Sequence, residues 1–174
     1  MDEAVQDLLD REAVRSVVAL LARGEDRRDA DLLKRAFWPD STFDYGVYKG
    51  GFAEYLAWVV PGAESITNTQ HVLGQTYVEL DGSTARAETH VLSYHRVSID
   101  GAERDTVIGG RYLDELEKRE GRWAIRHRTM LYDWFQDWGA AADWGQGVMG
   151  YPFHGDHYTG TAKEDWSKVF FARR

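Results

Sequence analysis

The sequence contains no cysteine, which excludes disulfide bonds, iron–sulfur clusters and thiol nucleophiles and favours a reducing compartment. It has only three prolines, and no linker rich in Pro or Ser divides it. No apolar run approaches the roughly 18 residues that a membrane-spanning helix needs. The first residues lack a basic stretch followed by an apolar one, so no signal peptide is expected. These absences predict a cytoplasmic protein without a membrane span.

Basic residues are also scarce. Lys and Arg number 21 against 29 Asp and Glu, which gives a formal net charge of −8. Affinity for nucleic acids depends largely on cationic contacts to phosphates, and anionic membranes likewise attract basic segments. We therefore expect neither nucleic acid nor membrane as a partner. The length of 174 residues suits one main domain with its own core.

The motifs of several enzyme classes are missing. The sequence has no GxGxxG, no P-loop, no GxSxG and no HExxH. The motifs typical of dinucleotide-binding proteins, nucleotide-binding proteins and serine hydrolases are therefore absent. His154 and His157 flank Asp156 and could form part of a metal site. No further ligand pattern accompanies them, and a polar loop is the favoured interpretation. We expect neither a metal nor a cofactor.

The first half of the sequence has helical periodicity. Apolar side chains recur at near-helical spacing over residues 2–23, and a polar break at residues 24–28 follows. Asp29 is placed to cap a second helix. Residues 41–45 alternate like a short strand, and a third helix is expected over residues 52–60.

The second half changes to the alternating period of strands. Turn sequences at Asp81-Gly82, Asp100-Gly101 and Glu120-Gly121 separate four predicted strands, over residues 71–80, 84–99, 104–118 and 122–134. Helices followed by a run of long antiparallel strands predict an α+β fold, with helices against one face of a curved sheet. Such a sheet encloses a pocket.

Two residues could carry acid–base chemistry. Asp26 lies in the polar break, where an ordinary loop carboxylate or helix cap is the simpler interpretation. The alternative is an acid that orients a catalytic histidine. His71 begins the first long strand, and histidine is the commonest general base near neutral pH, although a histidine at a strand start is usually only partly exposed.

Alternation assigns further side chains to the pocket. On the second long strand the small and apolar face carries Thr89, Val91, Ser93 and His95, whereas the opposite face is charged. On the last strand one face carries Arg126, Arg128, Met130, Tyr132 and Trp134. By alternation alone the two arginines could face solvent. An inward Arg128 would need a partner such as Asp26, because a buried charge without one is costly.

At these residues the sequence resembles a known family. Residues 70–76 resemble the segment around the catalytic histidine of scytalone dehydratases, and residues 24–29 resemble their catalytic aspartate region, with Glu25 replacing a tyrosine. Asp44-Tyr45 matches an Asp-Tyr pair of these enzymes, whose tyrosine helps to hold the substrate carbonyl through water. Residues 93–95 align, with a one-residue gap, with a second active-site histidine.

The end of the sheet is more similar to hexachlorocyclohexane dehydrochlorinases, in which an arginine follows a Gly-x-Trp turn as Arg128 follows Gly121-Arg122-Trp123. Those enzymes pair the arginine with an Asp–His dyad. Both groups belong to the SnoaL-like, nuclear transport factor 2-like superfamily of cone-shaped α+β barrels. The resemblance covers roughly residues 5–135 and implies that fold, which hosts enzymes and non-enzymatic binding proteins alike.

The resemblance implies a cofactor-independent lyase that eliminates across a carbon–oxygen or carbon–halogen bond, most simply a dehydratase of a cyclic or polyketide-like hydroxy-carbonyl compound. His71 would act as the base, Asp26 would orient it, and Tyr45 with His95 would polarise the carbonyl. Arg128 would pair with Asp26 or stabilise a leaving group. An isomerase or cyclase with the same base, or a binding protein for an apolar ligand, are the alternatives. Relatives of this shape are often dimers or trimers, which implies a homo-oligomer.

Aromatic residues are abundant, with 7 Trp, 9 Tyr and 7 Phe. Eleven of them lie between residues 132 and 171, mostly beyond the last predicted strand. We therefore expect a barrel domain over residues 1–135 and an aromatic, Gly-rich extension over residues 136–174. The extension could cover the sheet edge or a neighbouring subunit. The resemblance to scytalone dehydratases implies instead a lid over the substrate.

Overall fold

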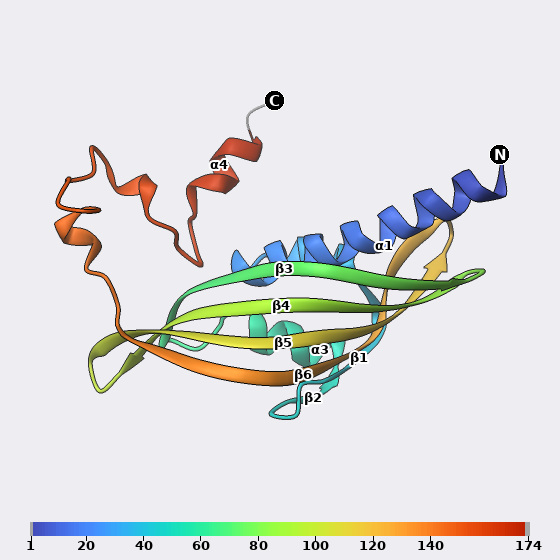
Figure 1. The fold of residues 1–174 in the computed structure, drawn as a ribbon, viewed down its shortest axis with the longest axis horizontal. Coiled ribbons are helices and arrows are strands. Elements are labelled where there is room, and N and C mark those ends of the chain that lie inside the picture. Colours follow the sequence, from blue (N-terminus) through green and yellow to red (C-terminus); the bar gives the residue numbers. More distant parts are fainter. Residues whose placement is uncertain (1, 173–174) are drawn as a thin grey trace.

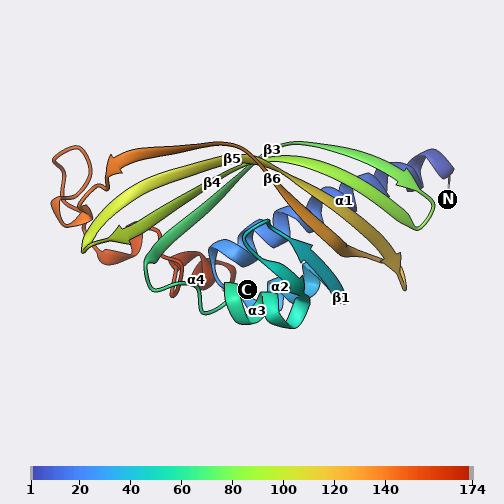
Figure 2. The same ribbon diagram turned by 90° about the horizontal axis from the view of Figure 1, so that it is seen from below.

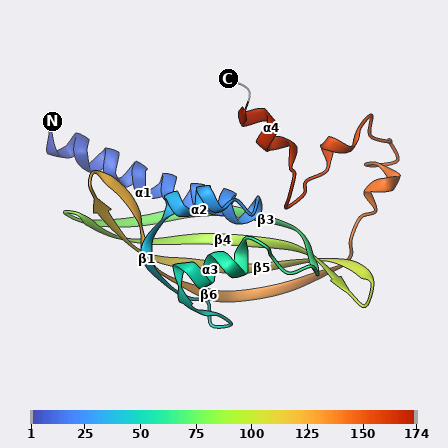
Figure 3. The same ribbon diagram turned by 180° about the vertical axis from the view of Figure 1, so that it is seen from behind.

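The computed structural model describes residues 2–172, in which six strands form one curved sheet and three helices lie against its concave face (Figures 1 and 2). The helices are α1 (Glu3–Asp26), α2 (Ala30–Ala36) and α3 (Phe52–Val59). The strands are β1 (Phe37–Asp44), β2 (Lys49–Gly51), β3 (Ile66–Asp81), β4 (Thr84–Ile99), β5 (Ala102–Arg119) and β6 (Arg122–Ala140). Seen from behind, α1, α2 and α3 all lie on the same side of the sheet (Figure 3). The predicted α+β fold is confirmed.

Long antiparallel hairpins build most of the sheet, whose strand order is β2-β1-β6-β5-β4-β3. The turn after β4 has φ of +51° at Asp100 and +80° at Gly101, and the turn after β5 has φ of +52° at Glu120 and +78° at Gly121. Two successive residues with positive φ match the twist of the flanking strands, as the turn sequences predicted. Among the strands of residues 2–172, β1 and β6 form the one parallel pair, and the sheet stays open.

Helix α1 is longer than expected. Its first turn is capped by Asp2, and the helix runs through Asp26, so the break predicted at residues 24–28 begins only at Arg27. Gly24 does not end the helix but allows close packing against α2, because a Cβ atom there would lie 2.8 Å from Leu33 Cδ2. The predicted cap of α2 is confirmed, since Asp29 Oδ1 accepts hydrogen bonds from two amides of the first turn. The last turn of α1 therefore carries Asp26 rigidly.

An aromatic stack fixes α3 against β1. The rings of Phe43 and Tyr55 are parallel, with centroids 4.1 Å apart, and Phe37 meets Tyr55 edge-on. Such pairs add stability beyond the area that they bury. The stack belongs to the hydrophobic core, which also contains Leu21 and Leu33 from the first two helices. Its consequence for the site is that Tyr55 and Tyr45 point toward the end of α1.

Strand β6 contains a bulge that changes which side chains face inward. Glu115 pairs with His127 and Leu116 with Ile125, which leaves Arg126 as the extra residue. Before the bulge Ile125 is buried, and after it Arg128 is buried. Simple alternation places these two residues on opposite faces, so the possibility that Arg128 faces solvent is wrong.

The C-terminal extension leaves the sheet after β6, which continues past residue 135 to Ala140. Two short 3-10 turns (Trp144–Gln146 and Asp156–Tyr158) and α4 (Trp166–Ala172) follow, and α4 stands apart from the sheet (Figure 1). It is held near α1 by Arg27, which forms an ion pair of 3.2 Å with Asp165, and by Arg23, which donates to the Ser167 hydroxyl and lies over the ring of Phe171. Large aromatic side chains stay exposed, with 64% of Trp138 and 65% of Phe171 accessible. Among the described helices, none is both long and apolar enough to cross a membrane.

Candidate active site

The side chains of His71 and Asp26 meet beneath the concave face of the sheet. His71 Nδ1 lies 2.7 Å from Asp26 Oδ1, and the backbone N–H of His71 also donates to both carboxylate oxygens at 3.1 Å. Both side chains are nearly buried. The contact expected between these two residues is therefore present. Because Nδ1 is engaged by the carboxylate, Nε2 is the ring nitrogen left to act on a ligand.

The two histidines of the site have opposite pKa shifts. Burial alone lowers the pKa of His71, but the hydrogen bond to Asp26 and the charges of Glu25 and Asp26 outweigh it, so the pKa is raised. The pKa of His95 is lowered, first by burial and then by the charge of His71. The rings meet edge-on with centroids 6.2 Å apart. His71 is thus the more basic of the two imidazoles.

Glu25 lies in the site, although the sequence analysis did not assign it a role there. Its Oε1 accepts hydrogen bonds from the hydroxyl groups of Tyr55 at 2.5 Å and Tyr45 at 3.3 Å. Its Oε2 lies 3.6 Å from His71 Nε2. His71 therefore stands between two carboxylates, with Asp26 on one ring nitrogen and Glu25 facing the other. The only sequence signal was that Glu25 replaces a tyrosine in the resembled segment.

A cavity of about 270 Å³ opens beside His71. Its wall is mainly apolar and includes Trp58 and Ile108, and the predicted site residues that line it are Tyr45, His71, Ser93, His95, Met130 and Tyr132. The Tyr132 hydroxyl donates to the backbone carbonyl of Tyr45 at 2.8 Å, which closes one side. An apolar wall with a few converging polar groups is typical of a site for a small organic ligand.

Three residues expected to touch the substrate do not line this cavity. Thr89 and Val91 face inward as predicted but are packed into the core, and the Thr89 hydroxyl bonds to that of Thr76 at 3.1 Å. Trp134 is half exposed and lies over Gly109, where a Cβ atom would come within 2.1 Å of the indole. No described residue after Tyr132 lines the cavity, so the extension does not close it in this conformation.

Arg128 is buried but does not pair with Asp26, so that expectation is wrong. Its guanidinium makes two hydrogen bonds of 2.7 Å to the carboxylate of Asp114, which stands opposite on β5. It also stacks on the ring of Tyr112, with Cζ 3.7 Å from the ring centroid. Burial alone would lower the pKa of Arg128, but Asp114 raises it well above its usual value. The ion pair lies behind the cavity wall that Tyr112 forms.

Two tyrosine hydroxyls remain donors at any ordinary pH. Burial, followed by the charge of Glu25, raises the pKa of Tyr45 and of Tyr55 well above the usual range. A group that keeps its proton can polarise a carbonyl oxygen by donating a hydrogen bond. Tyr45 lines the cavity and can do so once its longer, 3.3 Å hydrogen bond to Glu25 is released, whereas Tyr55 stays bound to Glu25 at 2.5 Å.

Arg28 fixes the rim of the cavity. It has a φ of +47°, and its guanidinium donates to the backbone carbonyls of Pro61 at 2.9 Å and Ile66 at 2.6 Å. These bonds join the segment after α1 to the loop between α3 and β3. Gly62 is required beneath it, because a Cβ atom there would meet Arg28 Cζ at 2.3 Å.

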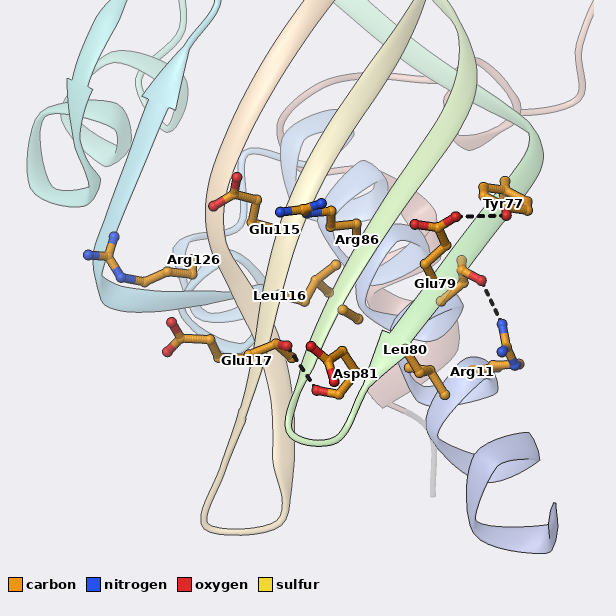
Figure 4. Close-up of a pocket in the computed structure, with 13 residues that line it drawn as sticks. Arg11, Tyr77, Glu79, Leu80, Asp81, Arg86, Glu115, Leu116, Glu117 and Arg126 are labelled. Atoms are coloured by element: carbon orange, nitrogen blue, oxygen red, sulfur yellow. Dashed lines mark hydrogen bonds between the residues drawn. The ribbon is translucent and has the colours of Figure 1, made fainter. Parts of the chain in front are cut away.

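A larger depression of about 850 Å³ lies at the other end of the sheet (Figure 4). Charged side chains of both signs surround it, including Arg11, Glu79, Asp81 and Arg86, and the Arg11 guanidinium bonds to the carbonyl of Val78. It contains neither His71 nor any other predicted site residue. Across the described residues, no group of three or more His, Asp or Glu side chains is placed to hold a metal ion.

An open curved sheet over three helices, with a buried His–Asp pair at an apolar cavity, defines a class of small α+β proteins. The SnoaL-like domain model matches residues 6–129, and the chain belongs to this family. The expected family is therefore confirmed. No curated protein matches the sequence.

Solved structures share the fold. A hexachlorocyclohexane dehydrochlorinase, LinA type 2, has a TM-score of 0.73 at 17% identity, over 84% of this chain and 100% of that one. The LinA type 3 enzyme from Novosphingobium barchaimii has a TM-score of 0.68 at 19% identity, over 88% and 100%. A scytalone dehydratase candidate from Novosphingobium aromaticivorans has a TM-score of 0.68 at 17% identity, over 88% and 99%. At these identities the likeness establishes the common fold.

Proposed function

We propose that the protein is a cofactor-independent lyase that dehydrates a cyclic hydroxy-carbonyl compound. The observation that carries the proposal is the 2.7 Å contact between His71 Nδ1 and Asp26 Oδ1 at the wall of an apolar cavity. A carboxylate on one ring nitrogen fixes the tautomer and stabilises the cation that forms when the other nitrogen takes a proton. The fold shared with a dehydrochlorinase and a scytalone dehydratase candidate supports an elimination.

The proposed reaction begins with removal of a carbon-bound proton. His71 Nε2 takes the proton from the carbon next to the carbonyl, and the carbonyl oxygen gains negative charge. Tyr45 turns its hydroxyl hydrogen from Glu25, 3.3 Å away, to that oxygen, and His95 can donate a second hydrogen bond. The bond between the β-carbon and its hydroxyl group then breaks. The hydroxyl group takes up one proton and leaves as water. General base catalysis of this kind contributes about 10²–10⁴-fold.

An isomerase or cyclase with the same base, and a protein that binds such a compound without converting it, remain the competing functions. The first would use His71 in the same way but release no water. The second would need the cavity and not the base. Both are outcomes of the experiment below.

The experiment uses 3-hydroxy-1-tetralone, a bicyclic β-hydroxy ketone whose dehydration gives 1-naphthol. We expect the wild type to form 1-naphthol and His71→Gln to lose this activity while it still binds the ketone. His90→Gln is the matched control, because His90 lies exposed on the outer face of β4 and should retain full activity. Conversion without loss of water would support the isomerase or cyclase. Binding without any conversion that depends on His71 would support the binding protein.

We also propose a cytoplasmic homo-oligomer, a dimer or trimer. The exposed aromatic side chains of the extension support an assembly, because a surface of that composition is usually covered. The lack of cysteine is consistent with a reducing compartment.

A further inference from the structure

Glu25 is held in an arrangement that a purely structural carboxylate does not need. Its Oε1 accepts both tyrosine hydrogen bonds, from Tyr55 at 2.5 Å and Tyr45 at 3.3 Å. Its Oε2 is buried and has no hydrogen-bond partner in the part of the chain that the structure describes. An unpartnered buried acceptor costs stability, so its persistence in a site calls for a ligand or a reaction that uses it.

The free oxygen of Glu25 is directed at the reaction centre. Oε2 lies 3.6 Å from His71 Nε2, the nitrogen that does not face Asp26, and Glu25 itself lines the cavity. Any ligand group that reaches His71 Nε2 therefore also comes close to Glu25. Tyr55 holds the carboxylate at Oε1, so Glu25 stays in place when Tyr45 turns its hydroxyl hydrogen to the substrate.

We infer that Glu25 and His71 share one proton and that Glu25 delivers it to the departing hydroxyl group of the substrate. The inference rests on the proposed function and assigns a second catalytic residue to it. In the reactive form the proton is on Glu25, and His71 Nε2 is free. His71 takes the proton from the α-carbon, and the hydroxyl group takes the proton from Glu25 as its bond to the β-carbon breaks.

These proton transfers close the cycle. The substrate loses one hydrogen to His71 and its hydroxyl to water, while Glu25 ends as a carboxylate and His71 as a cation. Transfer of the proton from Nε2 to Oε2 regenerates the reactive form, with no other reactant. Acid and base are thereby two different groups, so neither has to move between the α-carbon and the leaving group.

The same arrangement selects the substrate class. A hydroxyl group leaves easily only when it is protonated, and Glu25 provides that proton. A halide departs as an anion without taking a proton, so a proton donor beside it accelerates its departure far less. We therefore expect β-hydroxy carbonyl compounds to be preferred over compounds that lose a halide.

The test separates the two proton transfers with the variant Glu25→Gln. The Gln side chain can still accept the bonds from Tyr55 and Tyr45 but cannot release a proton. We expect formation of 1-naphthol from 3-hydroxy-1-tetralone to fall by about 10²–10⁴-fold. Exchange of the α-protons of 1-tetralone for deuterium, which needs only the base, should stay within several-fold of wild type. Glu54→Gln, on the exposed face of α3, is the matched control and should change neither rate.

Other results have defined meanings. A variant that loses dehydration and exchange to the same extent would show that Glu25 only positions His71, and a variant that keeps full dehydration would also overturn the inference. If Glu25→Gln does not fold, Tyr55→Phe retains the carboxylate but releases Oε1, and it should slow dehydration more than exchange. If the wild type performs neither reaction, the proposed function fails. NMR titration of His71 then tests whether His71 and Glu25 share a proton. If the pKa of His71 is the same in Glu25→Gln as in the wild type, the inference is contradicted.

Discussion

Arg128 forms a fully buried ion pair with Asp114 across β5 and β6, with two hydrogen bonds of 2.7 Å and neither side chain exposed. The pair leaves Asp26 free to hold His71. It also places a fixed positive charge behind Tyr112, in the wall of the cavity. We therefore expect Arg128 to support the cavity wall through Tyr112, because it does not touch the His–Asp pair.

Asp114→Asn should be strongly destabilising. Removing one partner of a buried ion pair leaves an uncompensated charge and costs about 3–5 kcal/mol. The free energy of unfolding in urea measures the loss. Asp133→Asn is the control, because the ion pair of Asp133 with Arg111 is exposed and its loss should matter far less. An equal loss of unfolding free energy in the two variants would contradict the claim that the cost arises from burial of the ion pair.

Asp26→Asn should remove the base function of His71 and leave the fold intact. The amide can donate to Nδ1, which forces the proton onto Nε2 and blocks the nitrogen that faces the cavity. We expect the dehydration of 3-hydroxy-1-tetralone to fall about 10²–10⁴-fold, with a melting temperature near that of wild type. An active Asp26→Asn variant would exclude the proposed tautomer control.

The two site histidines should titrate on opposite sides of the ordinary value of about 6.5. The pKa of His71 is raised and that of His95 is lowered. In NMR titration the ring signals of His71 should therefore move at higher pH than those of His95. His71→Gln should raise the pKa of His95, because a nearby positive charge is removed. The opposite order of the two titrations would contradict the geometry of the site.

The raised pKa of His71 also has a consequence for stability. Its contribution is fully present below the unfolded value of about 6.5 and is lost as pH rises through the folded value. The free energy of unfolding of the wild type should therefore fall over this alkaline window more than that of His71→Gln. Parallel curves for the two proteins would show that the Asp26 contact does not favour the cation.

Gly110→Ala should loosen the sheet beside the cavity. A Cβ atom there would lie 2.3 Å from the backbone oxygen of Leu131 and 2.6 Å from Met130 Cε. Such overpacking typically costs about 1–3 kcal/mol, measured as the free energy of unfolding. Gly160→Ala meets its nearest atom, on Asn68, at 3.5 Å and is the control. Equal stability of the two variants would mean that β5 and β6 adjust freely.

Removal of residues 142–174 should affect assembly more than the site. The extension contacts the rest of the chain through the side chains of Arg23, Arg27 and Arg96, and none of its described residues lines the cavity. We expect light scattering to give a smaller particle for the truncated protein than for the full chain, with the His71 titration unchanged. Loss of ligand binding with unchanged particle size would favour a lid instead.

Elements governed by local sequence could be predicted. The hairpins follow from the turn pairs at Asp100-Gly101 and Glu120-Gly121, and α2 follows from its cap at Asp29. The inward face of β4 follows from alternation, because a regular strand keeps its period of two. Only the resemblance linked His71 with Asp26, because 45 residues separate them in the sequence.

The remaining features depend on tertiary packing. Alternation cannot detect the bulge at Arg126, so it could not place Arg128 against Asp114. Glu25 meets Tyr55 only because the aromatic stack seats α3 beside the end of α1. A polar break was expected from residue 24, yet the helix continues through Gly24, whose lack of a side chain lets Leu33 pack closely against it.

The most direct measurement follows the first proton transfer alone. In D₂O, 1-tetralone exchanges its α-protons when a base removes them, and it has no hydroxyl group to eliminate. The wild type should accelerate this exchange well above the uncatalysed rate, and His71→Gln should return it to that rate while His90→Gln exchanges like the wild type. Exchange that is equally fast in His71→Gln and the wild type would contradict the assignment of His71 as the base.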